Sequence, residues 1–539
     1  MIEFENKRRV LEQMFEVYLR RGELAKVQEV LMLLEREFPA DVKLLVYKMR
    51  FADINGDYES VINLGNSALK LPEEIEPRLK MLIHHLLGYA YDHIGNAIQS
   101  AHHYRESTQV NFSTVTDKNL LEKLRHERRE DFSNYLFVLH NLSPSQISSE
   151  QLFSEISKFN ELVADIPRYN HNKDLHRNHD KIRLGYISPD LRYHVAAFFS
   201  YHLFRYYDQS KFEVYCYAKC PEDALSLEIK SFVDGWRNIA NDDSASAAAK
   251  IFNDEIDILI DLAGHTANNC LEVLAYKPAP IQISAIGWFN STGLNAVDFF
   301  IADRLTVPDE RINSLFTEVV LRLRHSHFCY TWHGADFPVV PAPCLKNGYV
   351  TFGSFNNFAK VTDEILIVWS DILNAVPKSK LFLKSTIFNS DYARRLTLER
   401  LNKAGINIDR VRLEGSENNY LIKYQEVDIA LDTFPYVGGG TTCDALYMGV
   451  PVITLIGDRH ASRFGYSILS NVGLNELCAA TSKDYVNIAI ELANDCDRIN
   501  AYHLSIREMM EQSPLMNYYA YLAELELILQ KVFAIKICN

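Results

Sequence analysis

The run from Leu431 to Thr442, LDTFPYVGGGTT, holds the residues of this chain that are best suited to bind an anion. An apolar run precedes it and a helix-like run follows it, so we expect a strand, a glycine-rich turn and a helix. Glycines such as Gly440 let the backbone approach a ligand, and the N–H groups at a helix start attract negative charge. Thr441 and Thr442 add hydroxyl donors. The run predicts a phosphate cradle without the P-loop lysine; a structural glycine turn is the alternative.

Three polar residues are placed to extend this cradle. Asn356 and Lys360 follow a strand-like run over 349–355. A lysine at the mouth of a cleft can stabilise a diphosphate leaving group as its charge develops, and Asn356 can hydrogen-bond the same group. Asp444, just inside the helix, is placed to accept ribose hydroxyls, as acids in dinucleotide folds do. The structural alternatives are a solvated lysine and an acid that favours the helix dipole.

Other polar runs also follow predicted strands. His194 comes after a strand-like run at 182–188, and imidazole is the natural general base near neutral pH. The motif alone favours a capping or core histidine. Residues 261–269 (DLAGHTANN) and 290–292 offer hydrogen bonds to an acceptor or to sugar hydroxyls, with ordinary loop chemistry as an equal alternative. Residues 457–463 (GDRHASR) are expected to line the same edge.

The bulk composition excludes several classes of protein. The net charge of −14 disfavours a surface that tracks nucleic-acid phosphates. Nine cysteines without a CxxC pair favour a reducing compartment, and the charged N-terminus does not resemble a signal peptide, so we expect a cytoplasmic protein. No run of about 18 apolar residues predicts a membrane span.

A metal cofactor is not expected. The only D-x-D triplet in the second half is Asp495-Cys496-Asp497, which lies in a polar, helix-like stretch and not at a strand end. Without a carboxylate pair at the cleft, Lys360 and the helix start must carry the phosphate charge. The pattern therefore favours metal-independent transfer.

Residues 1–165 are expected to form a helical domain. Apolar residues recur there at steps of three and four, as in amphipathic helices. Turn-like glycines recur as well: Gly22 and Gly56 lie 34 positions apart, the tetratricopeptide (TPR) period, and Gly95 follows. We predict TPR-like repeats, whose concave surface suits peptides, over a plain helical bundle.

The rest of the chain predicts two α/β domains, at 181–340 and 346–539, after a polar linker at 166–180. Short apolar runs that alternate with helical stretches indicate parallel sheets covered on both faces. Two Rossmann-like domains facing a cleft would bind ligands beyond the carboxyl ends of their strands. The expected strands are 182–188, 212–218, 256–263, 281–287 and 297–303, then 349–355, 380–384, 411–414, 427–432 and 451–456.

Taken in order, five pieces of sequence resemble the O-GlcNAc transferase/SPINDLY family of protein glycosyltransferases. They cover roughly residues 181–475 and read LGYISPDLRYHVAAFF, DLAGHTANN, KPAPIQISAIGW, FGSFNNFAKVTDEIL and ALDTFPYVGGGTTCDALYMGVPVITLIGDRHASR. The resemblance implies a GT-B fold behind a TPR-like region. It implies inverting, metal-independent transfer from a nucleotide sugar to Ser or Thr of a protein or peptide.

The resemblance also implies roles for single residues. The family's histidine at the sugar–acceptor site falls on His194, and its diphosphate-contacting lysine falls on Lys360, preceded by Asn356. Its phosphate-binding threonines fall on Thr441 and Thr442. In addition, its ribose-binding carboxylate falls on Asp444, and a basic residue near the base falls on Lys423.

Two departures bear on the donor. Tyr420 stands where the family usually has a histidine, and Gly439-Gly440 stand where it often has a histidine or threonine. Tyr420 can still stack on the base or ribose. We expect UDP-GlcNAc as donor, with GDP-fucose or UDP-glucose as alternatives. A catalytically inactive helical-repeat scaffold is a third hypothesis. By resemblance, flagellin or another surface protein is an expected acceptor.

Overall fold

The chain forms two compact units. A helical unit comprises residues 1–139 with 387–399, and a two-sheet unit comprises 140–386 with 400–539. The structure is a computed structural model that describes residues 2–38, 41–72, 74–171, 179–417 and 419–538. Part of the predicted linker, residues 172–178, lies outside the described residues.

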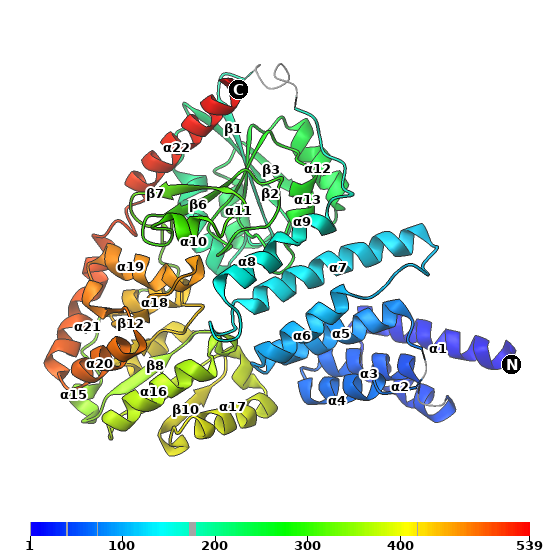
Figure 1. Ribbon diagram of the computed structural model, residues 1–539, viewed down its shortest axis with the longest axis horizontal. Helices are drawn as coiled ribbons and strands as arrows, with labels where there is room; N and C mark the ends of the chain where they lie inside the picture. Colours follow the sequence, from blue (N-terminus) through cyan, green and yellow to red (C-terminus); the bar gives the residue numbers. More distant parts are fainter. Residues whose placement is uncertain (1, 39–40, 73, 172–178, 418, 539) are drawn as a thin grey trace. The chain divides into compact units, whose positions relative to one another are not determined.

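Helix pairs that turn at a glycine build the helical unit (Figure 1). Gly22, Gly56 and Gly95 have φ of +68°, +68° and +75°, a conformation natural to glycine, and each joins two helices that pack together. Asp57 and Asn96 then cap the second helices of their pairs. The expected all-α repeat region is confirmed. Its helices are α1 (Ile2–Arg20), α2 (Leu24–Glu37), α3 (Val42–Ile54), α4 (Tyr58–Ala68), α5 (Pro77–His93), α6 (Ala97–Thr108), α7 (Lys118–Leu139) and most of α17 (Asp391–Lys403).

Two parallel sheets form the two lobes of the second unit. The first lobe has the strand order β3-β2-β1-β4-β5-β6-β7, and the second has β10-β9-β8-β11-β12-β13. Both are doubly wound orders, so the predicted pair of Rossmann-like lobes is confirmed. The strands are β1 (Ile182–Ser188), β2 (Phe212–Ala218), β3 (Gly235–Asn238), β4 (Ile258–Asp261), β5 (Ile281–Ser284), β6 (Phe299–Asp303), β7 (Val319–Leu323), β8 (Thr351–Ser354), β9 (Lys380–Lys384), β10 (Val411–Glu414), β11 (Ile429–Leu431), β12 (Val452–Leu455) and β13 (Cys478–Ala479).

Helices connect these strands (Figure 1). Most strand positions are buried. The strand order reverses between β1 and β4 and between β8 and β11, which is where such folds bind ligands. The helices of this unit are α8 (Ser149–Ser157), α9 (Phe159–Leu162), α10 (Val195–Arg205), α11 (Ala224–Lys230), α12 (Ser244–Asn253), α13 (Leu271–Ala275), α14 (Glu310–Asn313), α15 (Cys344–Asn347), α16 (Asp363–Ala375), α18 (Gly440–Tyr447), α19 (Phe464–Val472), α20 (Ser482–Ala493), α21 (Cys496–Glu511) and α22 (Tyr518–Cys538).

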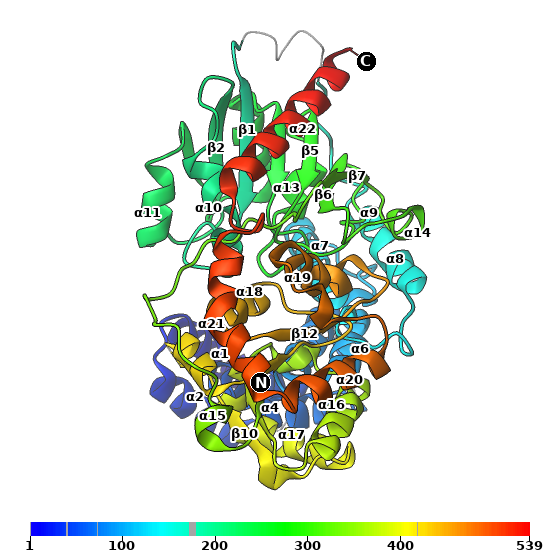
Figure 2. The same cartoon turned by 90° about the vertical axis from the view of Figure 1, so that its left-hand side faces the viewer.

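The compact units do not follow the domain limits expected from sequence. Helices α8 and α9 were expected in the helical domain, yet they belong to the two-sheet unit because Phe159 packs edge-on against His265 of the first lobe. Helix α22 was expected with the second lobe. It returns to the first sheet instead, beside α10 and β7 (Figures 1 and 2). Its Tyr521 hydroxyl donates to the His327 carbonyl at 3.1 Å.

Candidate active site

The glycine loop after β11 is fixed by a buried carboxylate. Asp432 Oδ1 accepts the N–H of Gly438 at 2.7 Å and the N–H of Thr433 at 2.9 Å, while Oδ2 accepts the Thr454 hydroxyl at 2.8 Å. Burial raises the pKa of Asp432 to about 6, and these hydrogen bonds oppose the rise. Asp432 therefore fixes the loop between Thr433 and Gly438. The last glycine of the loop, Gly440, is the first residue of the helix that follows.

Helix α18 begins at Gly440, and the predicted threonines occupy its first turn. The Thr441 hydroxyl donates to Asn356 Oδ1 at 2.8 Å, and the Thr442 hydroxyl donates to the Gly438 carbonyl at 3.1 Å. No side chain caps the helix at Gly439. The N–H groups of its first turn, at the positive end of the helix dipole, can therefore bind an anion. The structure thus brings Asn356 and both threonines together.

Lys360 lies beside the same loop. It ends a 3-10 turn after β8, Phe358–Lys360, and its half-buried ammonium sits 3.6 Å from the ring centroid of Tyr436. Burial lowers the pKa of Lys360 to about 8, against the attraction of Asp432. Lys360 and the threonines therefore flank one loop, as the predicted leaving-group site requires.

A small cavity of about 10 Å³ lies under the glycine loop, lined by Asn356, Asp432, Thr441 and other residues. Ser354, the last residue of β8, also lines it. The Ser354 hydroxyl is buried, and no residue of the described ranges hydrogen-bonds it. Sequence reasoning missed Ser354, although its place at the end of β8 could have indicated it.

Asp444 is bound by two tyrosines. Its Oδ1 accepts the Tyr330 hydroxyl and its Oδ2 accepts the Tyr420 hydroxyl, both at 2.6 Å. Burial raises the pKa of Asp444 to about 6, against both phenols. Tyr330 follows β7 and was not predicted. Asp444 and Tyr420, which were predicted separately as donor-binding residues, are in direct contact.

Lys423 lies with Tyr420 in a 3-10 segment, Tyr420–Glu426. Its ammonium is 3.3 Å from Glu426 Oε1 and 4.0 Å from Glu414 Oε2. Two carboxylates thus share its charge. A contact of Lys423 with a nucleobase stays a prediction.

His194 caps α10 in the first lobe. Its Nδ1 accepts the Ala196 N–H at 3.3 Å and lies 3.5 Å from Asp190 Oδ1. Burial lowers the pKa of His194, while Asp190 opposes that change. A neutral ring that accepts at Nδ1 carries its proton on Nε2, so the cap leaves His194 a donor on its other nitrogen.

The starts of α10 and α18 approach each other across the two lobes. A Cβ built on Gly440 would lie 2.5 Å from Val195 Cγ2, the residue next to His194. The residue after His194 therefore lies against the start of α18, so His194 and the phosphate cradle belong to neighbouring elements of the two lobes.

The sequence matches a known family. Residues 121–338 and 343–525 match the profile described as Glycosyl transferase family 41. The chain belongs to this family. The probable UDP-N-acetylglucosamine--peptide N-acetylglucosaminyltransferase SPINDLY of Hordeum vulgare is 40% identical over 351 residues, which are 64% of this chain and 37% of that protein. Its Arabidopsis thaliana counterpart is 39% identical over 368 residues, 67% of this chain and 40% of that protein.

This family 41 chain thus spans about two fifths of the length of the curated relatives it matches. A solved structure, a lysine-to-methionine mutant of the Thermobaculum terrenum O-GlcNAc transferase, matches 99% of this chain and 98% of that one. The TM-score is 0.83 at 25% identity. The expected O-GlcNAc transferase/SPINDLY membership and GT-B fold are confirmed.

Three motifs of this family 41 chain form internal contacts. In the first lobe, His265 Nε2 donates to the Thr292 carbonyl at 2.8 Å, and the Ser291 hydroxyl donates to Glu318 at 2.7 Å. In the GDRHASR motif, Arg459 binds the Ile147 carbonyl and Arg463 binds the Leu305 carbonyl. The polar side chains of these motifs therefore hydrogen-bond to other segments of the two-sheet unit.

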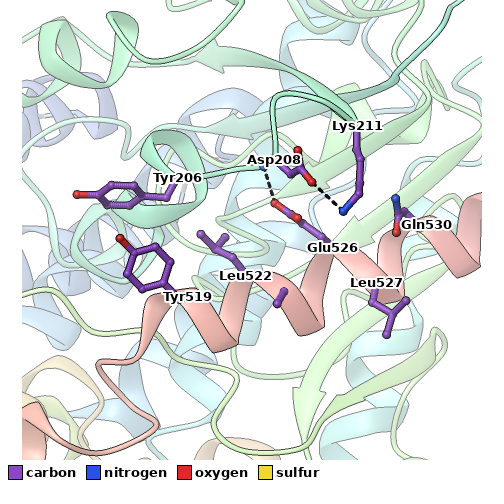
Figure 3. Close-up of a pocket in the computed structure, with 9 residues that line it drawn as sticks. Tyr206, Asp208, Lys211, Tyr519, Leu522, Glu526, Leu527 and Gln530 are labelled. Atoms are coloured by element: carbon purple, nitrogen blue, oxygen red, sulfur yellow. Dashed lines mark hydrogen bonds and ion pairs between the residues drawn. The ribbon is translucent and has the colours of Figure 1, made fainter.

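Another cavity lies away from the glycine loop. It measures about 380 Å³ and is lined by residues before β2 and on α22 (Figure 3). Its charged groups are paired with each other: Lys211 lies 2.7 Å from Asp208, whose N–H donates to Glu526 at 2.9 Å. Because it adjoins the amino end of β2, it is at the wrong edge of the sheet for the strand-end chemistry.

Two features concern the described residues as a whole. They contain no cluster of three or more His, Cys, Asp or Glu side chains placed to hold a metal ion. None of their helices combines the length and apolar character needed to cross a membrane.

Proposed function

We propose that this chain is an inverting protein O-glycosyltransferase that moves GlcNAc from UDP-GlcNAc to Ser or Thr of a protein acceptor without a divalent ion. The family membership and the names of the relatives support the reaction class and the donor. The observation that carries the mechanism is the hydrogen bond between Asn356 and Thr441 at the start of α18, with Lys360 against Tyr436 of the loop that leads into this helix.

The proposed chemistry divides between the lobes. As the bond from the anomeric carbon to the diphosphate breaks, Lys360, Asn356 and the α18 amides stabilise the negative charge on the leaving group. The acceptor hydroxyl attacks from the opposite face, its oxygen forms the new glycosidic bond, and its proton leaves to solvent. The Nε2–H of His194 orients this hydroxyl from the first lobe.

The helical unit is proposed to bind the acceptor, since stacked helix pairs present a long surface to a peptide. Flagellin or another surface protein stays a predicted acceptor, and the cytoplasm stays the predicted location.

Intact-mass measurement of candidate acceptor proteins tests the proposal. The chain is incubated with UDP-GlcNAc, UDP-glucose and GDP-fucose in separate reactions, each with and without a chelator. A mass gain of one N-acetylhexosamine that survives the chelator supports the proposal. A mass gain that corresponds to another sugar would replace UDP-GlcNAc as the proposed donor. No gain with any donor, in the wild type and in a Lys360→Ala control alike, supports the inactive scaffold.

A further inference from the structure

Two adjoining cavities form a groove along α22, and the proposed transfer uses none of the residues that line it. The cavity of about 380 Å³ in Figure 3 and a second one of about 280 Å³ share Lys211 and Gln530. Cavities of roughly 300–1,000 Å³ hold small organic ligands. This α22 groove adjoins the amino end of β2, whereas His194 follows the carboxyl end of the parallel strand β1, so the groove is separate from the proposed active site.

One end of the α22 groove is aromatic (Figure 3). The rings of Tyr206 and Tyr519 line it, and these residues are 37% and 68% exposed. Tyr518 packs against both, with 4.6 Å and 4.2 Å between ring centroids, and it also stacks on His202 at 4.3 Å. Neighbouring rings thus hold two exposed aromatic side chains in place at the mouth of a cavity, where they can pack against the apolar face of a ligand.

The middle of the groove is polar. Asp208 is already engaged, because Lys211 lies 2.7 Å from its Oδ2 and the Ser210 N–H donates to its Oδ1 at 3.0 Å. Glu526 Oε1 accepts the Asp208 N–H at 2.9 Å. Within the described ranges, Glu526 Oε2 and the Gln530 amide have no hydrogen-bond partner. These two side chains therefore offer acceptors and an N–H donor to a ligand.

A buried carboxylate lies at the other end of the groove. Asp257 lines the second cavity and is only 1% exposed. Its Oδ2 accepts the Arg183 N–H at 2.8 Å, but its Oδ1 has no partner among the residues that the structure describes. A buried oxygen without a donor is costly. This position therefore favours a ligand that carries hydroxyl or N–H groups.

The lining of the α22 groove fits a neutral saccharide better than an anion. A sugar ring has a face of C–H groups that can pack on an aromatic ring, and hydroxyls around its rim that both donate and accept. Phosphate-bearing ligands are disfavoured because carboxyl groups outnumber ammonium groups in the lining. The carboxyl groups are those of Asp180, Asp208, Asp257 and Glu526, and the ammonium groups are those of Lys181 and Lys211.

We propose that the α22 groove is a second carbohydrate-binding site, where a neutral saccharide packs one ring on Tyr519 and turns its hydroxyls toward Glu526, Gln530 and Asp257. The saccharide expected there is GlcNAc already attached to an acceptor, an assignment that rests on the proposed function. The groove would retain a modified acceptor on the enzyme while the active site transfers GlcNAc to another of its residues.

Ligand-observed NMR titration tests the site. The probes are the GlcNAc disaccharide N,N′-diacetylchitobiose and the glucose disaccharide cellobiose, which has the same linkage. They are titrated into the full chain as wild type, Tyr519→Ala, Tyr519→Phe and Leu504→Ala, the last a control at a 51% exposed position on α21. Tyr519→Ala should weaken binding about fivefold or more, because a packing ring is lost. Tyr519→Phe keeps the ring, so it and the control should stay within about twofold of the wild type.

The titrations have outcomes that overturn the inference. No binding of either disaccharide removes the site, as does an equal loss in Tyr519→Ala and Leu504→Ala. Displacement of the disaccharide by UDP would place it in the active site instead. Binding of a proline-rich peptide in place of both disaccharides would make the groove a peptide site. Tighter binding of N,N′-diacetylchitobiose supports the GlcNAc assignment, and equal or tighter binding of cellobiose overturns that assignment.

Transfer assays separate this inference from the proposed function. Tyr519→Ala should transfer GlcNAc to an unmodified acceptor at the wild-type rate, whereas its transfer to an acceptor that already carries GlcNAc should slow about fivefold at low acceptor concentration, in line with the lost packing contact. Saccharide binding without any transfer supports the site and removes the transferase. Transfer without saccharide binding removes the site and leaves the transferase.

Discussion

The turn after β4 in the first lobe and the turn after β11 in the second are built alike. Asp261 and Asp432 begin them, and each carboxylate accepts two backbone N–H groups of its own turn. Each also accepts a hydroxyl from the next strand, from Ser284 at 3.1 Å and from Thr454 at 2.8 Å. Burial raises the pKa of both carboxyls to about 6. The lobes share one way to fix a turn at a strand end.

The two turns differ in what lies against their glycines. A Cβ added to Gly264 would lie 2.3 Å from Trp288, a fully buried ring. A Cβ added to Gly438 would instead lie 2.6 Å from the hydroxyls of Thr441 and Thr442. The Trp288 indole occupies the space beside the first-lobe turn and leaves no room for a ligand. The Thr441 and Thr442 hydroxyls beside the second-lobe turn can instead exchange their hydrogen bonds within the protein for hydrogen bonds to a ligand. The same framework is therefore closed in one lobe and chemically available in the other.

The lysines that follow β8 and β2 are expected to show the largest difference between the two lobes. Lys360→Ala should lower turnover about a hundredfold or more, because one charge contact to the leaving group is lost. Lys219 follows β2 in the first lobe, and its ammonium donates to the Asn269 carbonyl at 2.9 Å. Lys219→Ala should leave turnover within about threefold. Steady-state transfer rates of both variants are measured. Equal losses of turnover would show that the lysine beside the second-lobe turn contributes no more to transfer than the lysine in the first lobe.

Glycines at the start of α18 probe the geometry of the cradle. A Cβ at Gly440 lies 2.5 Å from Val195, so Gly440→Ala should push the two helix starts apart and raise the donor KM about tenfold. At Gly439 the nearest atoms are 3.9 Å away, so Gly439→Ala should change the donor KM by less than about threefold. Melting temperatures are measured in parallel. A large KM change in the Gly439 variant alone would contradict this placement of the cradle.

Much of the framework could be predicted because its signals are local. The strand-like run at 182–188 is β1 residue for residue, and Lys360 could be placed because it follows a predicted strand. Strands β3, β7 and β13 were missed: the first is a short edge strand, Gly235–Asn238, with exposed polar residues, and the last is an edge strand of two residues, Cys478–Ala479. Polar or half-exposed edge strands lack the apolar run that marks a buried one.

The other features of the site could not be predicted, because they depend on contacts between residues far apart in the sequence. Tyr330 was not predicted, because its partner Asp444 is 114 positions away in the chain. The turns at Asp261 and Asp432 look alike in sequence, each with a strand end, glycine and hydroxyl residues. Only the packing of Trp288, from a later loop, distinguishes the closed turn from the open one.

The pH dependence of transfer sharpens the role of Lys360. Because burial lowers its pKa to about 8, the cationic form is lost as pH rises through 8. The donor kcat/KM of the free enzyme should then fall about tenfold per pH unit above that value. Lys360→Arg should lack this alkaline limb, since a guanidinium keeps its proton. The same limb in the arginine variant would assign it to another group.

Paired hydroxyl deletions test the shared framework and carry the smallest expected effect. Ser284→Ala and Thr454→Val each remove one hydrogen bond to a buried carboxylate, so each should lower the free energy of unfolding by about 1–2 kcal/mol. Urea unfolding measures both. The donor KM should rise a few-fold only for Thr454→Val, because Asp432 holds the N–H of Gly438 while Asp261 holds a turn that Trp288 closes. A matching KM change in the Ser284 variant would mean that the first-lobe turn also faces the donor.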